Sequence, residues 1–209
     1  MLYTRKGDKG DTYAFGCNQR FMKSSALAEA LGAVDEINSL LGFVKVKAED
    51  LRFSAEGGSA SGGKILDLRM VQIVGQIQQD LFIVQANLAG AEKYITQEKI
   101  DAAEKIIDEI EKQMPAIKTF FISGGTELAA LFDYARAIAR RAERRVVGLS
   151  EERKTIIESN KESQSGAEPA KEIDPLILKY LNRLSSLLYA LARYVNFKAG
   201  VAEKPPTYI

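Results

Sequence analysis

The sequence predicts an all-α protein, a bundle of about five helices, and two observations support this fold class. Apolar residues recur at spacings of three and four along five separate segments, which is the period of amphipathic helices. No segment shows a persuasive alternation of apolar and polar residues of the kind typical of a strand. At 209 residues, 46% of them hydrophobic, the chain can fill one core, and we expect a single domain over residues 1–209.

Residues 1–23 are polar and interrupted by glycines, so we expect an ordered loop or an extended arm there. A first helix is predicted from Ser24 or Ser25, either of which suits the N-cap. Residues 54–63 contain the run Gly-Gly-Ser-Ala-Ser-Gly-Gly, which predicts a flexible connector. A second helix is expected over about 64–93, and its broad apolar surface indicates a helix that is central or shared with another subunit.

A third helix is predicted over 97–114, where Pro115 ends the helical pattern. The apolar run 120–122 then meets Ser123-Gly124-Gly125, a turn signal that begins a fourth helix near Thr126.

A fifth helix is predicted from Asp174-Pro175 to about Ala199, because proline suits the first turn of a helix. The segment 150–174 that precedes it is polar and, at roughly 25 residues, far longer than the usual connection between bundle helices. We therefore expect a flexible connector there, protected from proteolysis only when ligands are bound.

Composition excludes several classes of function. Lys and Arg number 29 against 28 Asp and Glu, so no net charge draws the chain to nucleic acid or to an anionic membrane. There is no histidine, which excludes His-containing serine triads, His-ligated zinc and Glu-x-x-His di-iron sites. The single cysteine, Cys17, allows no internal disulfide or thiolate cluster and fits a reducing compartment.

The chain shows no feature of a secreted or membrane protein. Its first residues lack the apolar core of a signal peptide, and no apolar run approaches the ~20 residues that span a bilayer. We expect a cytoplasmic protein.

The predicted fourth helix carries the most informative charge pattern. Five residues share about 100° of its circumference: Asp133, Arg136, Arg140, Glu143 and Arg144. Arginines repeated at a spacing of four destabilise a helix by about 0.2–0.5 kcal/mol per pair unless an anion compensates. Two interpretations remain open, a solvated basic face or a clamp for polyphosphate or carboxylate. Arg141 and Arg145 point elsewhere on the helix, as surface or interface charges would.

Two further patterns have both a plain and a functional interpretation. Glycines and lysines alternate in the N-terminal segment Thr4-Arg5-Lys6-Gly7-Asp8-Lys9-Gly10-Asp11-Thr12. This segment is a turn or an anion-binding loop, but it lacks Walker A spacing. The predicted fifth helix has a polar face of Asn182, Ser185 or Ser186, Tyr189, Arg193 and Asn196, which is either solvated or lines a pocket or an interface. Asp35 on the first helix is a candidate partner for one of the arginines.

Taken in order, six segments resemble the PduO-type ATP:corrinoid adenosyltransferases. They are Tyr-Thr-Arg-Lys-Gly-Asp-Lys-Gly-Asp-Thr at 3–12, Gly-Ala-Val-Asp-Glu-Ile-Asn-Ser at 32–39, Ile-Gln-Gln-Asp-Leu-Phe at 77–82, Phe-Phe-Ile-Ser-Gly-Gly at 120–125, Ala-Arg-Ala-Ile-Ala-Arg-Arg-Ala-Glu-Arg-Arg at 135–145 and Leu-Asn-Arg-Leu-Ser at 181–185. The resemblance covers nearly the whole chain outside the two predicted connectors. It implies a ferritin-like, cobalamin adenosyltransferase-like five-helix bundle with an ordered N-terminal loop.

The resemblance also implies a homotrimer that binds ATP at each subunit interface. The N-terminal loop, from Thr4 to Thr12, would wrap the triphosphate. The other ATP-binding residues implied are Lys23, Arg140, Glu143, Arg144 and Asn182, and Arg141 is included with them. Asp35 and Arg136 would form an ion pair across the interface. Mg²⁺ would be held through the ATP phosphates, with no metal site made of protein groups alone.

In the reaction so implied, Co(I) of a reduced corrinoid attacks the ribose C5′ of ATP and expels triphosphate to form adenosylcobalamin. No protein nucleophile or general base is needed, which agrees with a chain that has no histidine. Phe120 would press on the lower face of the corrinoid and keep ligands off cobalt. Further partners implied are a corrinoid reductase or an adenosylcobalamin-dependent enzyme.

The sequence departs from the family pattern at several positions. Ser123 replaces the usual proline, Asp133 a frequent histidine, Leu31 a common tyrosine, Ser186 a common aspartate, and Arg5-Lys6 the usual Lys-Thr. Two alternatives stay open beside the enzyme. One is a protein of the same fold that binds ATP or adenosylcobalamin without turnover, and the other is a structural helical oligomer.

Overall fold

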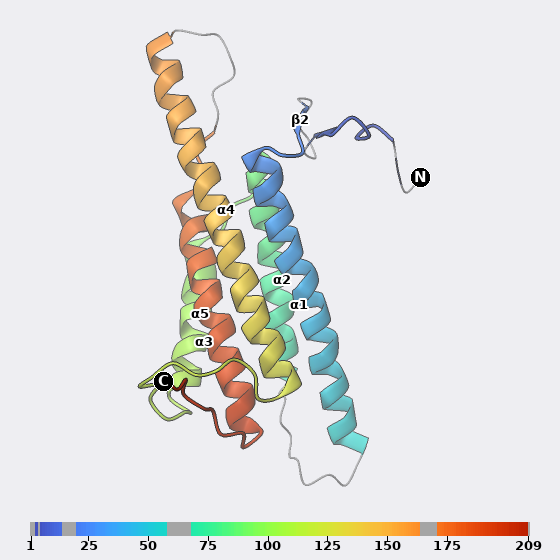
Figure 1. Ribbon diagram of the computed structural model, residues 1–209, viewed down its shortest axis with the longest axis vertical. Coiled ribbons are helices and arrows are strands. Elements are labelled where there is room, and N and C mark those ends of the chain that lie inside the picture. Colours follow the sequence, from blue (N-terminus) through green and yellow to red (C-terminus); the bar gives the residue numbers. More distant parts are fainter. Residues whose placement is uncertain (1–2, 4, 14–19, 58–67, 164–170, 209) are drawn as a thin grey trace.

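Five long helices make up the body of the protein, and the computed structural model describes residues 3, 5–13, 20–57, 68–163 and 171–208. The helices are α1 (Ala26–Gly57), α2 (Leu68–Leu88), α3 (Gln97–Glu111), α4 (Glu127–Ser163) and α5 (Pro175–Lys198). They run side by side along the long axis of the molecule (Figure 1), with α4 packed against both α1 and α5. The predicted all-α bundle of five helices is confirmed.

The predicted helix starts are confirmed by side chains that cap them. Ser25 Oγ accepts a hydrogen bond of 3.2 Å from the Ala28 amide, and Thr126 Oγ1 accepts one of the same length from Ala129. Asp174 accepts from the Leu176 amide at 2.9 Å, and proline follows it in the first turn of α5. Each cap satisfies one of the amides that the first turn of a helix leaves without a backbone partner.

Three helix ends differ from the sequence-based expectation. α1 continues through Gly57, because Lys47 to Glu56 consists largely of helix-forming residues and the glycine-rich run starts only there. The rest of the predicted connector, 58–63, lies outside the described residues, as does 64–67 of the predicted second helix. α2 ends at Leu88, where the turn is closed by bonds from the Ala91 amide to the Ala86 carbonyl and from Asn87 Nδ2 to the Lys93 carbonyl. α3 ends at Glu111, three residues before the predicted end.

The connector predicted over 150–174 is wrong for its first part, because α4 continues through Ser163. The segment is polar but contains no glycine or proline before Gly166, so nothing in it interrupts a helix. Arg153 anchors this extension by donating to the Leu88 carbonyl at 2.9 Å and to the Lys171 carbonyl at 3.3 Å. Residues 164–170 of the predicted connector lie outside the described part of the chain.

A short pair of strands precedes the helices. β1 (Asp11–Thr12) and β2 (Phe21–Met22) are antiparallel, with Asp11 opposite Met22 and Thr12 opposite Phe21. Segments of two residues are too short to show a period in the sequence, so the absence of a strand pattern did not exclude them. The pair orders the base of the N-terminal arm immediately before α1 begins.

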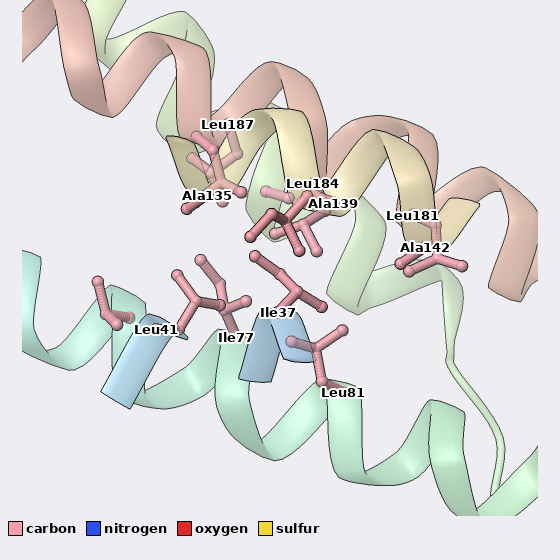
Figure 2. Packing of buried hydrophobic residues seen from close by; sticks show 14 of the residues in the cluster. Ile37, Leu41, Ile77, Leu81, Ala135, Ala139, Ala142, Leu181, Leu184 and Leu187 are labelled. Atoms are coloured by element: carbon pink, nitrogen blue, oxygen red, sulfur yellow. The ribbon is translucent and has the colours of Figure 1, made fainter. Parts of the chain in front are cut away.

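Small residues on α4 determine how closely the helices pack. Ala135, Ala139 and Ala142 are buried and face the centre of the bundle, where Ile37 of α1 and Leu184 of α5 meet them (Figure 2). Side chains of this size let neighbouring helices approach α4 closely. Each fully buried aliphatic side chain such as Ile37 contributes about 1.5–3 kcal/mol to folding.

A polar network is buried among α2, α3 and α5. Asp80 is 4% exposed, and its carboxylate accepts hydrogen bonds from Tyr180 at 3.1 Å and Gln76 at 3.0 Å and pairs with Lys99. Burial raises the pKa of the Tyr180 hydroxyl well above its ordinary value, and the neighbouring Asp80 carboxylate raises it further. Tyr180 therefore keeps its proton in the folded protein at a pH where an exposed tyrosine loses it.

This shift predicts a loss of stability at high pH. Above the ordinary tyrosine pKa of about 10 the unfolded chain ionises at Tyr180 while the folded protein does not, so the free energy of unfolding falls as pH rises. We expect Tyr180→Phe to reduce that slope by up to about 1.4 kcal/mol per pH unit. Urea unfolding from pH 8 to 11 measures it, with the exposed Tyr134→Phe as control. Equal slopes in the two variants would contradict the prediction.

Candidate active site

The arginine stripe of α4 lies beside the polar face of α5. Because Ala135, Ala139 and Ala142 face the core, helical periodicity places Arg136, Arg140 and Arg144 at the edge of α4 rather than in its buried face. The stripe is thereby brought alongside α5, which packs against α4 over much of its length. Members of the two polar faces that the sequence predicted separately therefore lie next to each other, with Arg136 and Arg140 beside Ser186 and Tyr189.

A cleft of about 670 Å³ opens between α4, α5 and the segment that follows α3. Its lining includes Phe120, Ser123, Arg136, Arg140, Ser186 and Tyr189. This volume lies within the range of small-molecule and cofactor sites, and the mixture of apolar walls with a few polar groups is typical of them. Phe120 is 77% exposed, so its ring is free to contact a ligand in the cleft.

A second cleft of about 340 Å³ lies next to the first along α4, toward the C-terminal end of this helix. It is lined by Arg140, Glu143, Arg144, Val147, Gly148, Glu151 and Asn182. Asn182 Nδ2 donates to Glu143 Oε1 at 3.0 Å, and Arg144 donates to the Arg140 carbonyl at 3.1 Å, so these side chains are already oriented. Arg140 lines both clefts and is the side chain that they share.

The turn at residues 123–125 is held by side chains from two helices, α4 and α5. The Gly124 amide donates to Asp133 Oδ2 at 3.0 Å, and Asn196 Nδ2 donates to the Gly124 carbonyl at 2.7 Å. Gly125 has a φ of +104°, and a Cβ there would lie 2.4 Å from Asn196 Oδ1. Both facts require glycine at this position, which explains the turn signal in the sequence.

Asp133 and Arg193 form a buried ion pair beside this turn. Their side chains are 5% and 2% exposed, and Nη2 of Arg193 lies 2.8 Å from Oδ2 of Asp133. Glu203, from the segment after α5, lies 2.7 Å from Arg193 Nε. The sequence left open whether the α4 stripe that includes Asp133 is solvated or binds an anion, and whether the α5 face that includes Arg193 and Asn196 is solvated or lines a pocket or an interface. All three are buried, because the turn and the C-terminal segment cover them.

The N-terminal loop is ordered by its own polar contacts. Gly10 has a φ of +83°, and Lys23 donates from Nζ to the Gly7 carbonyl at 2.8 Å. Arg20 contacts both carboxylate oxygens of Asp11, at 2.5 and 2.7 Å, and this hydrogen bonding lowers the pKa of the Asp11 carboxyl. The loop projects away from the bundle beside the start of α1, well separated from α5 (Figure 1). Thr4 lies outside the described residues.

The remaining predicted residues are spread over the surface of α1 and α4. Asp35 accepts a hydrogen bond from Gln85 at 3.4 Å, and Arg141 forms an ion pair with Glu36. Arg136 packs over the Tyr189 ring at 6.0 Å, and its buried Nε has no hydrogen-bond partner among the described residues. The structure thus brings Phe120, Arg136, Arg140, Glu143, Arg144 and Asn182 to one side of the α4–α5 pair. The loop, Lys23, Asp35 and Arg141 lie elsewhere in the same chain.

Sequence reasoning missed two residues, Arg20 and Glu203, and one contact of Asn196. Arg20 gave no signal, because its partner is nine residues away in a loop without a period. Glu203 follows the last helix and resembles any exposed glutamate. Asn196 was part of the recognised polar face, but its contact with a turn seventy residues earlier depends on the tertiary fold.

Among the residues that the structure describes, no cluster of three or more His, Cys, Asp or Glu side chains is arranged to hold a metal ion. None of the helices in the described ranges combines the length and the apolar character that crossing a membrane requires.

Comparison with known proteins identifies the family. The model of the family described as cobalamin adenosyltransferase matches residues 2–195. This chain belongs to that family. The corrinoid adenosyltransferase of Bacillus subtilis is 33% identical over 97% of this chain and 90% of its own length. The corrinoid adenosyltransferase PduO of Citrobacter freundii is 32% identical over 92% of this chain, which spans about half (49%) of that relative.

Solved structures of the same kind share the fold. A variant of the PduO-type ATP:corrinoid adenosyltransferase from Lactobacillus reuteri, complexed with cobalamin and ATP, superposes with a TM-score of 0.77. It is 29% identical, and the match covers 99% of this chain and 96% of that chain. The cobalamin adenosyltransferase-like fold predicted from the six segments is therefore confirmed.

The buried ion pair yields a stability prediction. Asp133→Ala leaves Arg193 short of one carboxylate and the Gly124 amide without its acceptor, so we expect a loss of about 3–5 kcal/mol in the free energy of unfolding. Asp133→Asn keeps an acceptor and should cost about 1–3 kcal/mol. Denaturant titration measures both. The exposed Asp108→Ala is the control and should stay within about 0.5 kcal/mol of the unchanged protein; an equally small effect at Asp133 would refute the assigned role.

Proposed function

We propose that this cobalamin adenosyltransferase family member transfers the 5′-deoxyadenosyl group of ATP to Co(I) of a reduced corrinoid. The observation that carries the proposal is that Arg140 lines both clefts, which places a site suited to a polyphosphate next to a larger site rimmed by an aromatic side chain. Adenosyl transfer requires that the two sites be adjacent, because the carbon that leaves ATP has to reach the metal of the second substrate. The relatives named above support the same activity.

The bond changes of this reaction balance without a protein nucleophile. The Co(I) electron pair attacks C5′ of the ribose, a cobalt–carbon bond forms, and the bond between C5′ and oxygen breaks so that triphosphate leaves with its electrons. The chain has to position the two substrates and stabilise the charge on triphosphate. Mg²⁺ bound to the phosphates would assist in that stabilisation.

Arg140 and Arg144 are the groups we assign to the triphosphate. Guanidinium groups match phosphate oxygens bidentately and keep their charge when water is excluded. The Glu143 carboxylate and the Asn182 amide, already bonded at 3.0 Å, are assigned to orienting the nucleotide. These side chains are fixed by helices, so little reorganisation is needed when ATP binds.

The N-terminal loop is assigned to the triphosphate of a neighbouring subunit. It contributes Arg5, Lys6, Lys9 and the backbone around Gly7 and Gly10, with Thr4, Asp8, Asp11, Thr12 and Lys23 beside them. The projection of this loop away from its own α4–α5 clefts supports an assembly in which it reaches another copy. A homotrimer that pairs Asp35 with Arg136 between subunits is the assembly we propose, and Arg141 belongs to the same proposed ATP-binding set.

Phe120 is assigned to the lower face of the corrinoid. Its ring is 77% exposed at the rim of the larger cleft, so a bound ligand could cover apolar surface that is in water in the free protein. An apolar ring against cobalt would keep water and other axial ligands away. A cytoplasmic location and a corrinoid reductase as supplier of Co(I) complete the proposal.

The first test is an anaerobic assay with ATP, Mg²⁺ and chemically reduced cob(I)alamin, followed by photolysis of the product. We expect light-sensitive adenosylcobalamin, and Arg140→Ala should lower kcat by about 10²-fold or more, because a preorganised cation is lost. The control is Arg145→Ala, which removes a surface arginine near Glu29 and should retain activity. Loss of the oligomer without any effect on nucleotide binding in Arg140→Ala would instead favour a structural oligomer.

A second substitution distinguishes the roles proposed for the two clefts. Phe120→Ala should lower the rate of adenosylcobalamin formation by about tenfold or more while leaving the Kd for ATP unchanged, because the ring belongs only to the larger cleft. Isothermal titration with ATP and the photolysis assay measure the two quantities. A weaker affinity for ATP with normal turnover would be incompatible with the assignment. ATP binding without any turnover in the unchanged protein would support a binding protein instead.

A further inference from the structure

The segment 120–125 is not held by burial of its own apolar side chains. Phe120 is 77% exposed and Ile122 is 59% exposed, and only Phe121 is partly covered. A segment of this kind gains little from the hydrophobic effect, whereas ordering its backbone costs about 1–2 kcal/mol per residue. Polar contacts with other elements therefore have to determine where Phe120 lies.

Those contacts come from the chain after α5 as well as from the helices. The Ile122 amide donates to the Lys204 carbonyl at 2.9 Å, which ties residues 120–125 (the aromatic segment) directly to the C-terminal segment 199–208. Glu203, the residue before, accepts from Asn196 Nδ2 at 3.0 Å, and the same amide group donates to the Gly124 carbonyl at 2.7 Å. Glu203 and Gly124 are thus joined through a single side chain.

Glu203 is also paired with a buried cation. Its side chain is 17% exposed and lies 2.7 Å from Nε of Arg193, whose guanidinium binds Asp133 on the other side. Asp133 in turn accepts from the Gly124 amide. Two routes therefore connect Glu203 with the turn at Gly124, one through Asn196 and one through Arg193.

The segment that carries Phe120 separates two cavities. The large cleft and a third cavity, of about 210 Å³, share the side chains of Met114, Ile117 and Phe121. The other walls of this third cavity include Arg193, Phe197, Val201 and Glu203. Open space on both sides means that packing alone does not fix this segment. Its position depends on the anchors at its end, where Ile122 and Gly124 are bound.

We propose that Glu203 is a positioning residue for adenosyl transfer, which holds the aromatic segment so that Phe120 faces the corrinoid cleft. The inference rests on the proposed function for its catalytic consequence, but its structural part does not. Without the Glu203 carboxylate, the Lys204 carbonyl loses the neighbour that fixes it against α5, and the aromatic segment becomes free to move between the two cavities.

The structural part can be tested without any substrate. The chain contains no tryptophan, so Ile122→Trp creates a single fluorescent reporter whose backbone amide still bonds to Lys204. In that background, Glu203→Ala should lower the equilibrium ratio of the ordered to the mobile state of the aromatic segment by about tenfold, as expected when a charge-assisted hydrogen bond is lost. The measurements are acrylamide quenching and anisotropy. Glu172→Ala removes an exposed carboxylate before α5 and should change neither.

The catalytic part is measured in the otherwise unchanged chain. Glu203→Ala should raise the KM for cob(I)alamin or lower kcat by about tenfold, with the KM for ATP unchanged, because only the segment that carries Phe120 is displaced. Glu203→Gln keeps the shape of the side chain and an acceptor for Asn196, so it should fold even if the alanine variant does not. Its KM for cob(I)alamin and its kcat should lie between those of the unchanged protein and those of Glu203→Ala. A merely structural role would move both KM values or neither.

The outcomes separate this inference from the proposed function. If the unchanged protein forms adenosylcobalamin but neither Glu203 variant alters the reporter or the corrinoid kinetics, the positioning role is refuted. If the reporter responds to Glu203→Ala while the unchanged protein forms no adenosylcobalamin, the contact is established and the proposed reaction is what fails. A response of equal size in Glu172→Ala would also overturn the inference, because it would show a general effect of charge.

Discussion

The site region depends on one buried arginine. Arg193 is 2% exposed, so its guanidinium has lost nearly all of its water and is stable only with carboxylates beside it. Asp133 comes from α4 and Glu203 from the segment after α5, and Arg193 itself belongs to α5. A single charge thus requires three parts of the chain to meet at one point. The turn at Gly124 is attached to that point through Asp133, which is how a constraint in the core reaches the rim of a cleft.

Arg140 and Arg144 of α4 illustrate the opposite arrangement, in which charge is kept near water. Arg136, Arg140 and Arg144 follow one another at a spacing that is unfavourable in an isolated helix. The structure offsets part of that repulsion locally, since Arg136 lies over the Tyr189 ring and Arg144 donates to a backbone carbonyl. Arg140 has the least local compensation in the described part of the chain, and it is the one that lines both clefts. A bound polyphosphate would supply the missing negative charge.

Local signals explain what could be predicted from the sequence. The starts of α1, α4 and α5 are determined by a capping side chain within a few residues, so they could be placed from the sequence. The glycines of the turn at 123–125 could also be recognised from the sequence, because the backbone conformation of the turn requires them. Helix ends were less predictable, since α4 extends to Ser163 partly through Arg153, whose partners belong to other elements. The stripe on α4 was visible as a period, but only packing showed which of its members face a cleft.

Sequence alone left open whether the polar faces of α4 and α5 are solvated or have partners in the protein, and the physical reason is general. A polar face is assigned to solvent by default because burying an unpaired charge is costly, and sequence alone does not show whether partners exist. On α5 the partners of Arg193 and Asn196 come from a turn before α4 and from the chain beyond α5, both remote in sequence. The clue was the residue type, since asparagine and tyrosine stood where lysine and glutamate usually cover an exposed helix. A polar helix face made of short or planar polar side chains, in place of flexible charged ones, indicates a face that has fixed partners. On α5 those partners determine where the aromatic segment lies.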